Sequence, residues 1–208
     1  PTPETNLNST KTASFGPNAE IYIMNASNKI MAKVKNLTSF DYGCTQFIID
    51  RQGSSAVQFW NSTPANYLLS KSFKVIPANS NPTGSYEISL YYTAAEVNGW
   101  QTASGQSIAS AQMVKVTNGR FVPDVTPATP FTADVSVVGA TVTSYGTDYE
   151  IKGVFNNSSF SGFGVGVPAA PVPVTLLSFN GYEKNNAAVL NWTTTSENNT
   201  RGFEVEKS

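Results

Sequence analysis

Carboxylates are the side chains of this sequence that come closest to offering catalytic chemistry, because histidine is absent from the chain. Histidine is the commonest general base near neutral pH and the commonest metal ligand in proteins. Glycoside hydrolysis instead needs two carboxyl groups facing each other across a cleft, one of them with a raised pKa. The acidic residues of the central region are scattered, and no spacing pairs any two of them: Asp41, Asp50, Glu87, Glu96, Asp124, Asp134, Asp148 and Glu150. We expect no enzyme activity and no catalytic residues; a pair of acidic side chains facing each other in a cleft would revive the hydrolase alternative.

The sequence also offers few residues that could act as a catalytic thiol or as metal ligands. Cys44 is the single cysteine, so no disulfide can form within the chain. Without a histidine to activate its thiol, we interpret Cys44 as a small buried side chain. Asp148 and Glu150, beside a turn at Gly146, are the most suggestive oxygen ligands for calcium, but no EF-hand or nonapeptide spacing accompanies them. The sequence therefore predicts neither a metal site nor a cofactor.

Aromatic residues give the better functional signal. Modules that bind carbohydrate use exposed tryptophan and tyrosine rings as flat platforms, because the C–H faces of sugars are apolar and stack on rings. Four candidates lie at strand ends, next to loops or on the polar face of a strand: Trp60, Tyr67, Tyr91 and Trp100. Core packing is the competing interpretation of each. Tyr91 is the most interesting of them, because strand alternation places it opposite an apolar face.

The composition narrows the possible partners. The chain has 208 residues and a net charge of -1, and charged residues make up 13%, about half the usual share. Binding to nucleic acid or to an anionic membrane surface needs clustered lysine and arginine, and none occurs. No stretch approaches the roughly 20 apolar residues that span a bilayer, so we expect no membrane insertion. A surface rich in serine, threonine and asparagine is typical of extracellular β-proteins, and we expect an extracellular or cell-surface location.

Period-two alternation dominates the chain and indicates β-strands. In the clearest case Tyr86, Ile88, Leu90 and Tyr92 share one face of the segment 85–92. The other expected strands of the main domain are 29–35, 45–50, 56–60, 72–76, 133–138, 140–145 and 149–155, with a hairpin turn at Asn118–Gly119 between 115–117 and 120–122.

One helical segment interrupts this pattern. Thr93 and Glu96 have the spacing of a capping box, and Gly99 supplies a C-terminal stop, which predicts little more than one helical turn that crosses between sheets. About ten short strands with short connections predict an all-β fold. We expect an antiparallel β-sandwich of the immunoglobulin or fibronectin kind, with a closed barrel as the structural alternative.

Proline and glycine divide the chain into segments. Residues 1–19 form an extended N-terminal lead-in, 20–165 the sandwich domain, and 166–174 a proline-rich linker that favours extended polyproline II. Residues 175–208 then supply three strands, 175–179, 188–192 and 202–206, with Trp192 as a core residue of the second. Three strands bury too little to be stable alone, so we expect an incomplete second β-module whose open edges recruit strands from the rest of its domain or from a neighbouring subunit.

The last 36 residues resemble the start of the fibronectin-III-like module found near the C-terminus of many secreted Bacteroidetes proteins. The matching positions are Pro173, Val174, Leu176, Phe179, Leu190, Trp192, Thr194, Ser196, Glu197, Asn199, Phe203, Val205, Glu206 and Ser208. A weaker resemblance over residues 30–104 is to the β-rich region that precedes such modules in surface proteins and reprolysin-like metallopeptidases of the same bacteria. The resemblance implies export by the type IX secretion route. The HExxH zinc motif of the peptidases has no counterpart here.

These features together predict a non-catalytic structural, spacer or adhesion module of a secreted or surface-exposed bacterial protein. The alternative is a carbohydrate-binding accessory module of a larger secreted enzyme. The expected partners are a polysaccharide, or neighbouring subunits or domains of the same protein.

Overall fold

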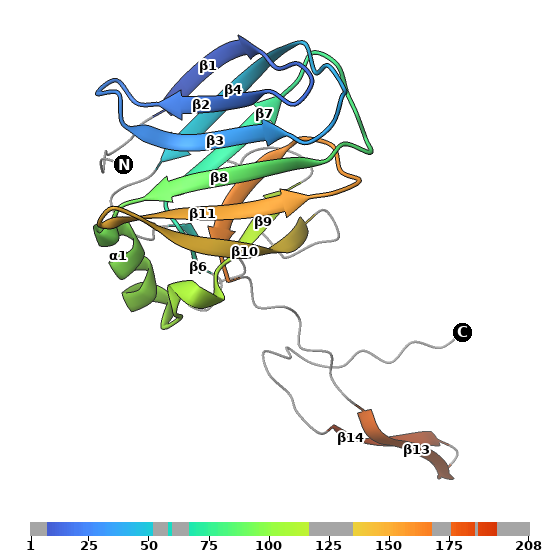
Figure 1. Cartoon of the computed structure of the whole chain (residues 1–208). Coiled ribbons are helices and arrows are strands. Elements are labelled where there is room, and N and C mark those ends of the chain that lie inside the picture. The colour runs from blue at the N-terminus through green and yellow to red at the C-terminus, as the bar shows by residue number, and fades with distance from the viewer. Residues whose placement is uncertain are drawn as a thin grey trace. The chain divides into compact units, whose positions relative to one another are not determined.

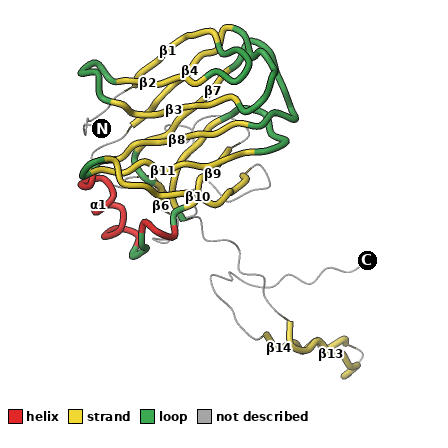
Figure 2. Tube along the Cα trace, in the orientation of Figure 1, coloured by secondary structure: helices red, strands yellow, loops and turns green. Residues whose placement is uncertain are grey.

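The computed structural model describes residues 8–51, 58–59, 67–116, 135–167, 176–185 and 187–194. The chain divides into two compact units, Pro1–Pro168 and Ala169–Ser208, and the boundary falls within the proline-rich segment 166–174. Strands dominate both units, as the yellow segments of Figure 2 show, and every described strand pairing is antiparallel. The all-β prediction is therefore confirmed.

Unit 1 contains two sheets that share one long strand, β10 (Figure 1). The first sheet contains, in spatial order, β1 (Asn8–Ser14), β4 (Cys44–Arg51), β7 (Lys71–Ile76), β12 (Gly162–Gly166), β9 (Gln112–Val116) and the first part of β10 (Val135–Tyr145), with the short strands β5 (Gln58–Phe59) and β6 (Tyr67–Leu68) beside β12. The second sheet contains the rest of β10, then β11 (Asp148–Phe155), β8 (Tyr86–Tyr92), β3 (Ile30–Asn36) and β2 (Glu20–Met24).

Gly139 marks the corner between the two sheets. Residues 135–139 pair with β9 in the first sheet, and residues 140–145 pair with β11 in the second. The sequence predicted two strands separated by Gly139, and this was wrong, because the glycine bends one continuous strand instead of ending it.

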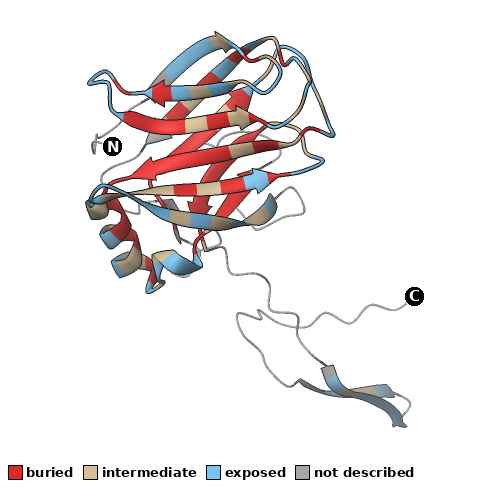
Figure 3. Ribbon diagram, viewed as in Figure 1, coloured by how far each residue is buried: buried red, intermediate tan, exposed pale blue. Residues whose placement is uncertain are grey.

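The core lies between the inner faces of the two sheets. Tyr86, Ile88, Leu90 and Tyr92 of β8 are all fully buried, which confirms the predicted apolar face (Figure 3). The Tyr86 ring stacks on Phe155 in the same sheet at 5.5 Å, and meets Phe163 of the opposite sheet edge-on at 5.7 Å. These contacts across the core identify a sandwich.

The sandwich stays open along one side. Among the described strands no pairing joins β1 to β2, so the structure does not close into a barrel. The Lys11 ammonium of β1 donates instead to the Tyr22 carbonyl of β2 at 2.9 Å. A charged side chain thus bridges the two edge strands.

Helix α1 (Ala94–Ser104) is longer than the sequence predicted. The Thr93–Glu96 capping box is present, but the helix continues through Gly99 and ends at Gly105, which has φ 69°. Its 11 residues make about three turns. Val97 and Trp100 are fully buried against the core, and this tertiary burial outweighs the weak helix propensity of one internal glycine. The helix leads from β8 through a 3-10 turn, Ile108–Ser110, to β9, and so crosses between the sheets as predicted.

Several further segments differ from the sequence-based predictions. Within the expected lead-in, β1 forms an edge strand and Phe15 is fully buried in the core. Strands β2 and β12 were not predicted. Cys44 is exposed, not buried: Thr45, Phe47 and Ile49 of β4 take the inward positions, which leaves Cys44 on the outward face. The expected hairpin at Asn118–Gly119 lies outside the described residues.

Unit 2 is described as one hairpin, formed by β13 (Leu176–Lys184) and β14 (Ala187–Thr194). Phe179 lies directly opposite Trp192, but these side chains are 55% and 36% exposed. Trp192 was expected in a core, but the described part of unit 2 is a single two-stranded layer in which this ring is partly exposed. The third predicted strand, 202–206, lies outside the described residues. Across the part of the chain that is described, no helix has the length and apolarity needed to cross a membrane.

Candidate functional site

Two of the four aromatic residues predicted to bind a ligand, Tyr91 and Trp100, are buried. Trp100 is fully buried in the core, and it lies on the same helix face as Glu96, Val97 and Ser104, which are also buried. A ring closed to solvent cannot stack on a sugar, so the prediction for Trp100 was wrong. Trp60 lies outside the described residues, and Tyr67 is placed only by its backbone, in β6.

Tyr91 does lie on the outward face of β8, as alternation predicted, but its side chain is only 3% exposed. The ring of Tyr145 meets it edge-on, with centroids 5.0 Å apart. Its hydroxyl donates to the Glu150 carboxylate at 3.1 Å. Tyr91 is therefore a buried ring on the outward side of β8 and not an exposed platform.

Strand register also gathers charged side chains on this outward face. Lys33 of β3 forms ion pairs with Glu87 at 3.5 Å and with Glu150 at 3.3 Å, and Lys152 of β11 pairs with Glu87 at 3.5 Å. We call Lys33, Glu87, Tyr91, Glu150 and Lys152 the outer-face network. It covers three adjacent strands of the second sheet, β3, β8 and β11, and its ionic side chains are 15–36% exposed.

Ionisation in this network follows from its contacts. Burial works to raise the pKa of Glu150, but hydrogen bonds and the charge of Lys33 outweigh burial, so this pKa is lowered. Burial likewise works to lower the pKa of Lys33, and Glu150 and Glu87 outweigh it, so that pKa is raised. Burial, followed by the charge of Glu150, raises the pKa of Tyr91. At neutral pH Lys33 and Glu150 are therefore charged and Tyr91 is neutral.

Two exposed tyrosines lie on the same outward face. Tyr22 of β2 lies directly opposite Lys33 and is 45% exposed, and Tyr145, at the end of β10, is 47% exposed. The Tyr22 hydroxyl donates to the Glu20 carboxylate. Neither tyrosine was predicted as a functional residue from the sequence. The available signal was their alternation within 20–24 and 140–145, but only the pairing register places them beside the outer-face network.

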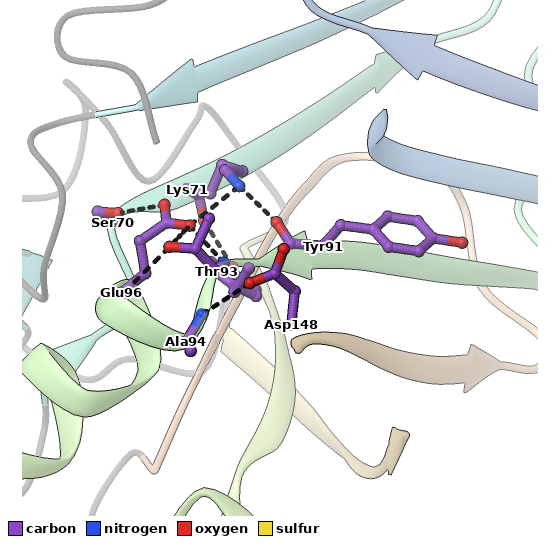
Figure 4. Close-up of polar contacts among 8 residues, drawn as sticks. Ser70, Lys71, Tyr91, Thr93, Ala94, Glu96 and Asp148 are labelled. Atoms are coloured by element: carbon purple, nitrogen blue, oxygen red, sulfur yellow. Dashed lines mark hydrogen bonds and ion pairs between the residues drawn. The ribbon is translucent and has the colours of Figure 1, made fainter. Parts of the chain in front are cut away.

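A second charged cluster is fully buried where α1 begins (Figure 4). The Lys71 ammonium lies 3.5 Å from the Glu96 carboxylate, and both side chains are 0% exposed. Lys71 also donates to the Tyr91 carbonyl and lies 4.9 Å from the centre of the Tyr92 ring.

Glu96 is held from several directions. It accepts from the Thr93 backbone N–H at 2.7 Å, from the Thr93 hydroxyl at 3.0 Å and from the Ser70 hydroxyl at 3.3 Å. These contacts fix the first turn of α1 against the start of β7. With no path to solvent, the cluster has a structural role, which is to fasten the helix to the first sheet.

The suggested calcium ligands have other roles. Asp148 accepts from the Ala94 backbone N–H at 3.0 Å, so it caps the helix, and Glu150 belongs to the outer-face network. Among the residues that the structure describes, no three acidic, cysteine or histidine side chains gather in a way that could hold a metal ion.

The described residues thus form a partly exposed polar surface, which is the outer-face network with Tyr22 and Tyr145 beside it, and a buried ion pair between Lys71 and Glu96. Comparison with known proteins adds no relative: no family, no curated protein and no solved structure matches this chain.

Proposed function

We propose that this chain is a non-catalytic structural or adhesion module of a secreted or surface-exposed bacterial protein. The proposal rests on the contacts of the two charged clusters, whose lysines and glutamates form ion pairs with one another. Lys71 and Glu96 are sealed in the core, and Lys33 and Lys152 neutralise Glu87 and Glu150 on the outer face. These ionic groups serve to hold strands and a helix together.

The chemistry of the outer-face carboxylates supports a non-catalytic role. A glycosidase needs one carboxylic acid with a raised pKa that can donate a proton. Glu150 has a lowered pKa, and Glu87 has a lysine on either side of it. Both groups are suited to accept hydrogen bonds. The chain also has no histidine that could act in their place.

The proposed location rests on composition and on the resemblance of the last 36 residues to modules of secreted proteins. A chain with 13% charged residues and two β units fits an extracellular part of a larger protein.

The location is tested on the bacterium that encodes the chain, with antibodies raised against purified unit 1. We expect labelling of intact cells or of the culture medium. Labelling that requires permeabilised cells would contradict the proposal.

The non-catalytic role is tested by incubating the 208-residue chain with polysaccharide and peptide substrates. Hydrolysis that disappears in Glu87→Gln or Glu150→Gln would contradict that role.

The second candidate is a carbohydrate-binding accessory module. The specific observation in its favour is the pair of exposed tyrosines, Tyr22 and Tyr145, on the face that carries the outer-face network.

A further inference from the structure

The outward face of the second sheet contains ordered rows of side chains. Directly paired residues of antiparallel strands project on the same side, so the register defines these rows. One row runs from Tyr22 through Lys33 and Ser89 to Lys152. The next row contains Tyr91 and Glu150, and Tyr145 contacts it through the Tyr91 ring.

Apolar ring surface is available on both sides of the charged centre. Tyr22 belongs to β2, on one side, and is 45% exposed; Tyr145 belongs to β10, on the other, and is 47% exposed. Each ring is anchored. The Tyr22 hydroxyl bonds Glu20, and the Tyr145 ring rests against Tyr91. Anchored rings lose little conformational entropy when a ligand stacks on them.

The centre of the face offers fixed donors and acceptors. Lys33 lies between two carboxylates, at 3.5 Å from Glu87 and 3.3 Å from Glu150, and Lys152 holds Glu87 from the other side. Ammonium groups only donate hydrogen bonds and carboxylates only accept them. A ligand hydroxyl can do both, so neighbouring hydroxyls can bond to both kinds of group at once.

We propose that this face binds a neutral polysaccharide chain, with sugar rings stacked on Tyr22 and Tyr145 and sugar hydroxyls bonded to Lys33, Glu150 and Lys152. The inference rests on the proposed adhesion role and names the ligand class for it. Two lysines and two glutamates balance within the network, so the centre of the face has no net charge that would attract a charged polymer.

A protein partner fits this face less well. The centres of protein–protein interfaces are depleted of charged residues. Here the charged residues occupy the centre, and the exposed aromatic rings lie at the sides. Covering these ion pairs with an apolar protein surface would remove their remaining solvation without replacing it.

The test uses the full 208-residue chain in affinity gel electrophoresis with soluble xylan, xyloglucan, galactomannan and mixed-linkage β-glucan, and in sedimentation with cellulose and chitin. We expect at least one of these neutral polymers to bind. Tyr22→Ala, Tyr145→Ala and Lys33→Met should each weaken that binding about 3- to 10-fold, the scale of one aromatic contact or hydrogen bond. Binding should change little with added sodium chloride, because the ligand carries no charge.

Tyr182→Ala is the matched control, because Tyr182 is 54% exposed and belongs to the hairpin of unit 2, not to the sheet that carries the proposed face. It should bind like the wild type. Urea denaturation of each variant separates lost contacts from lost folding. Absence of binding to all six polymers, equal loss in Tyr182→Ala, undiminished binding by a Tyr22→Ala/Tyr145→Ala double variant, or a steep salt dependence would each overturn the inference. If the chain binds no glycan but antibodies still label it on intact cells, the glycan-binding inference would be wrong and the proposed structural role would not be contradicted.

Discussion

Lys71 and Glu96 form an ion pair from which solvent is completely excluded, with nitrogen and oxygen 3.5 Å apart and both side chains 0% exposed. One partner begins strand β7 and the other lies in the first turn of α1. The pair therefore joins the helix to the sheet at one point.

We expect a single substitution in this pair to lower the free energy of unfolding more than a substitution of both partners. Glu96→Gln keeps a side chain that suits the capping box but removes the negative charge that Lys71 faces. Loss of one partner of a buried pair costs about 3–5 kcal/mol, so the free energy of unfolding in urea should fall by that order. The Lys71→Met/Glu96→Gln double variant should recover part of this loss, since it leaves no buried lysine charge. A double variant whose loss equals the sum of the two single losses would show that the pair is not coupled.

Gly153 in β11 and Gly139 at the corner of β10 should respond differently to alanine. A Cβ at Gly153 would lie 2.6 Å from the Met113 Cβ, and one at Gly139 would meet nothing within 4 Å. We expect Gly153→Ala to lower the free energy of unfolding by about 1–3 kcal/mol through overpacking. Gly139→Ala should be neutral or stabilise the fold by up to about 1 kcal/mol, because alanine restricts the unfolded chain. Thermal denaturation of the two variants gives the comparison, and equal destabilisation would contradict it.

The contact between Lys11 and the Tyr22 carbonyl predicts an effect on self-association. Charged side chains on edge strands oppose pairing with other chains. Lys11→Val should therefore increase association, measured by light scattering across a concentration series. Lys29→Val is the control, because Lys29 is an exposed lysine outside the strands. Association that rises equally in both variants would point to general loss of charge as the cause.

Glu150 predicts a specific pH dependence. Its pKa is lowered in the folded protein, so it stabilises the fold above the unfolded value of about 4.3, and this stabilisation disappears as the pH falls through the folded value. The free energy of unfolding should therefore decline below about pH 4.3, and the decline should be shallower in Glu150→Gln. Glu183→Gln removes a carboxylate from an exposed position of β13 and serves as the control. A profile unchanged by Glu150→Gln would contradict the assigned contacts.

Local pattern was most informative where one strand face is buried. Alternation identified the inward face of β8 and the outward position of Tyr91, and the capping box located the start of α1. Local reasoning failed where a residue type occurs both inside and at the ends of helices and strands. Gly99 lies inside a helix and Gly139 inside a strand, although glycine often ends both. Cys44 is exposed because its neighbours on β4 occupy the inward positions.

The candidate site was harder to predict than the fold. Tyr91 was named from its outward position. Trp100 was named as a possible ligand-binding residue with core packing as the competing interpretation, and it lies in the core. Tyr22 and Tyr145 are separated by more than a hundred residues, and no local signal connects them. Their proximity to Lys33 and Glu150 depends on which strands pair and in which register.

The sequence by itself determined the strand-rich class, the division near the proline-rich segment and the absence of histidine chemistry, because composition and period-two alternation are local properties of the chain. Only the tertiary structure decided that β10 belongs to both sheets, that Lys71 and Glu96 meet in the core, and that two tyrosines flank a charged face. These relationships depend on long-range pairing, and a shift of one residue in register would turn each outward side chain inward.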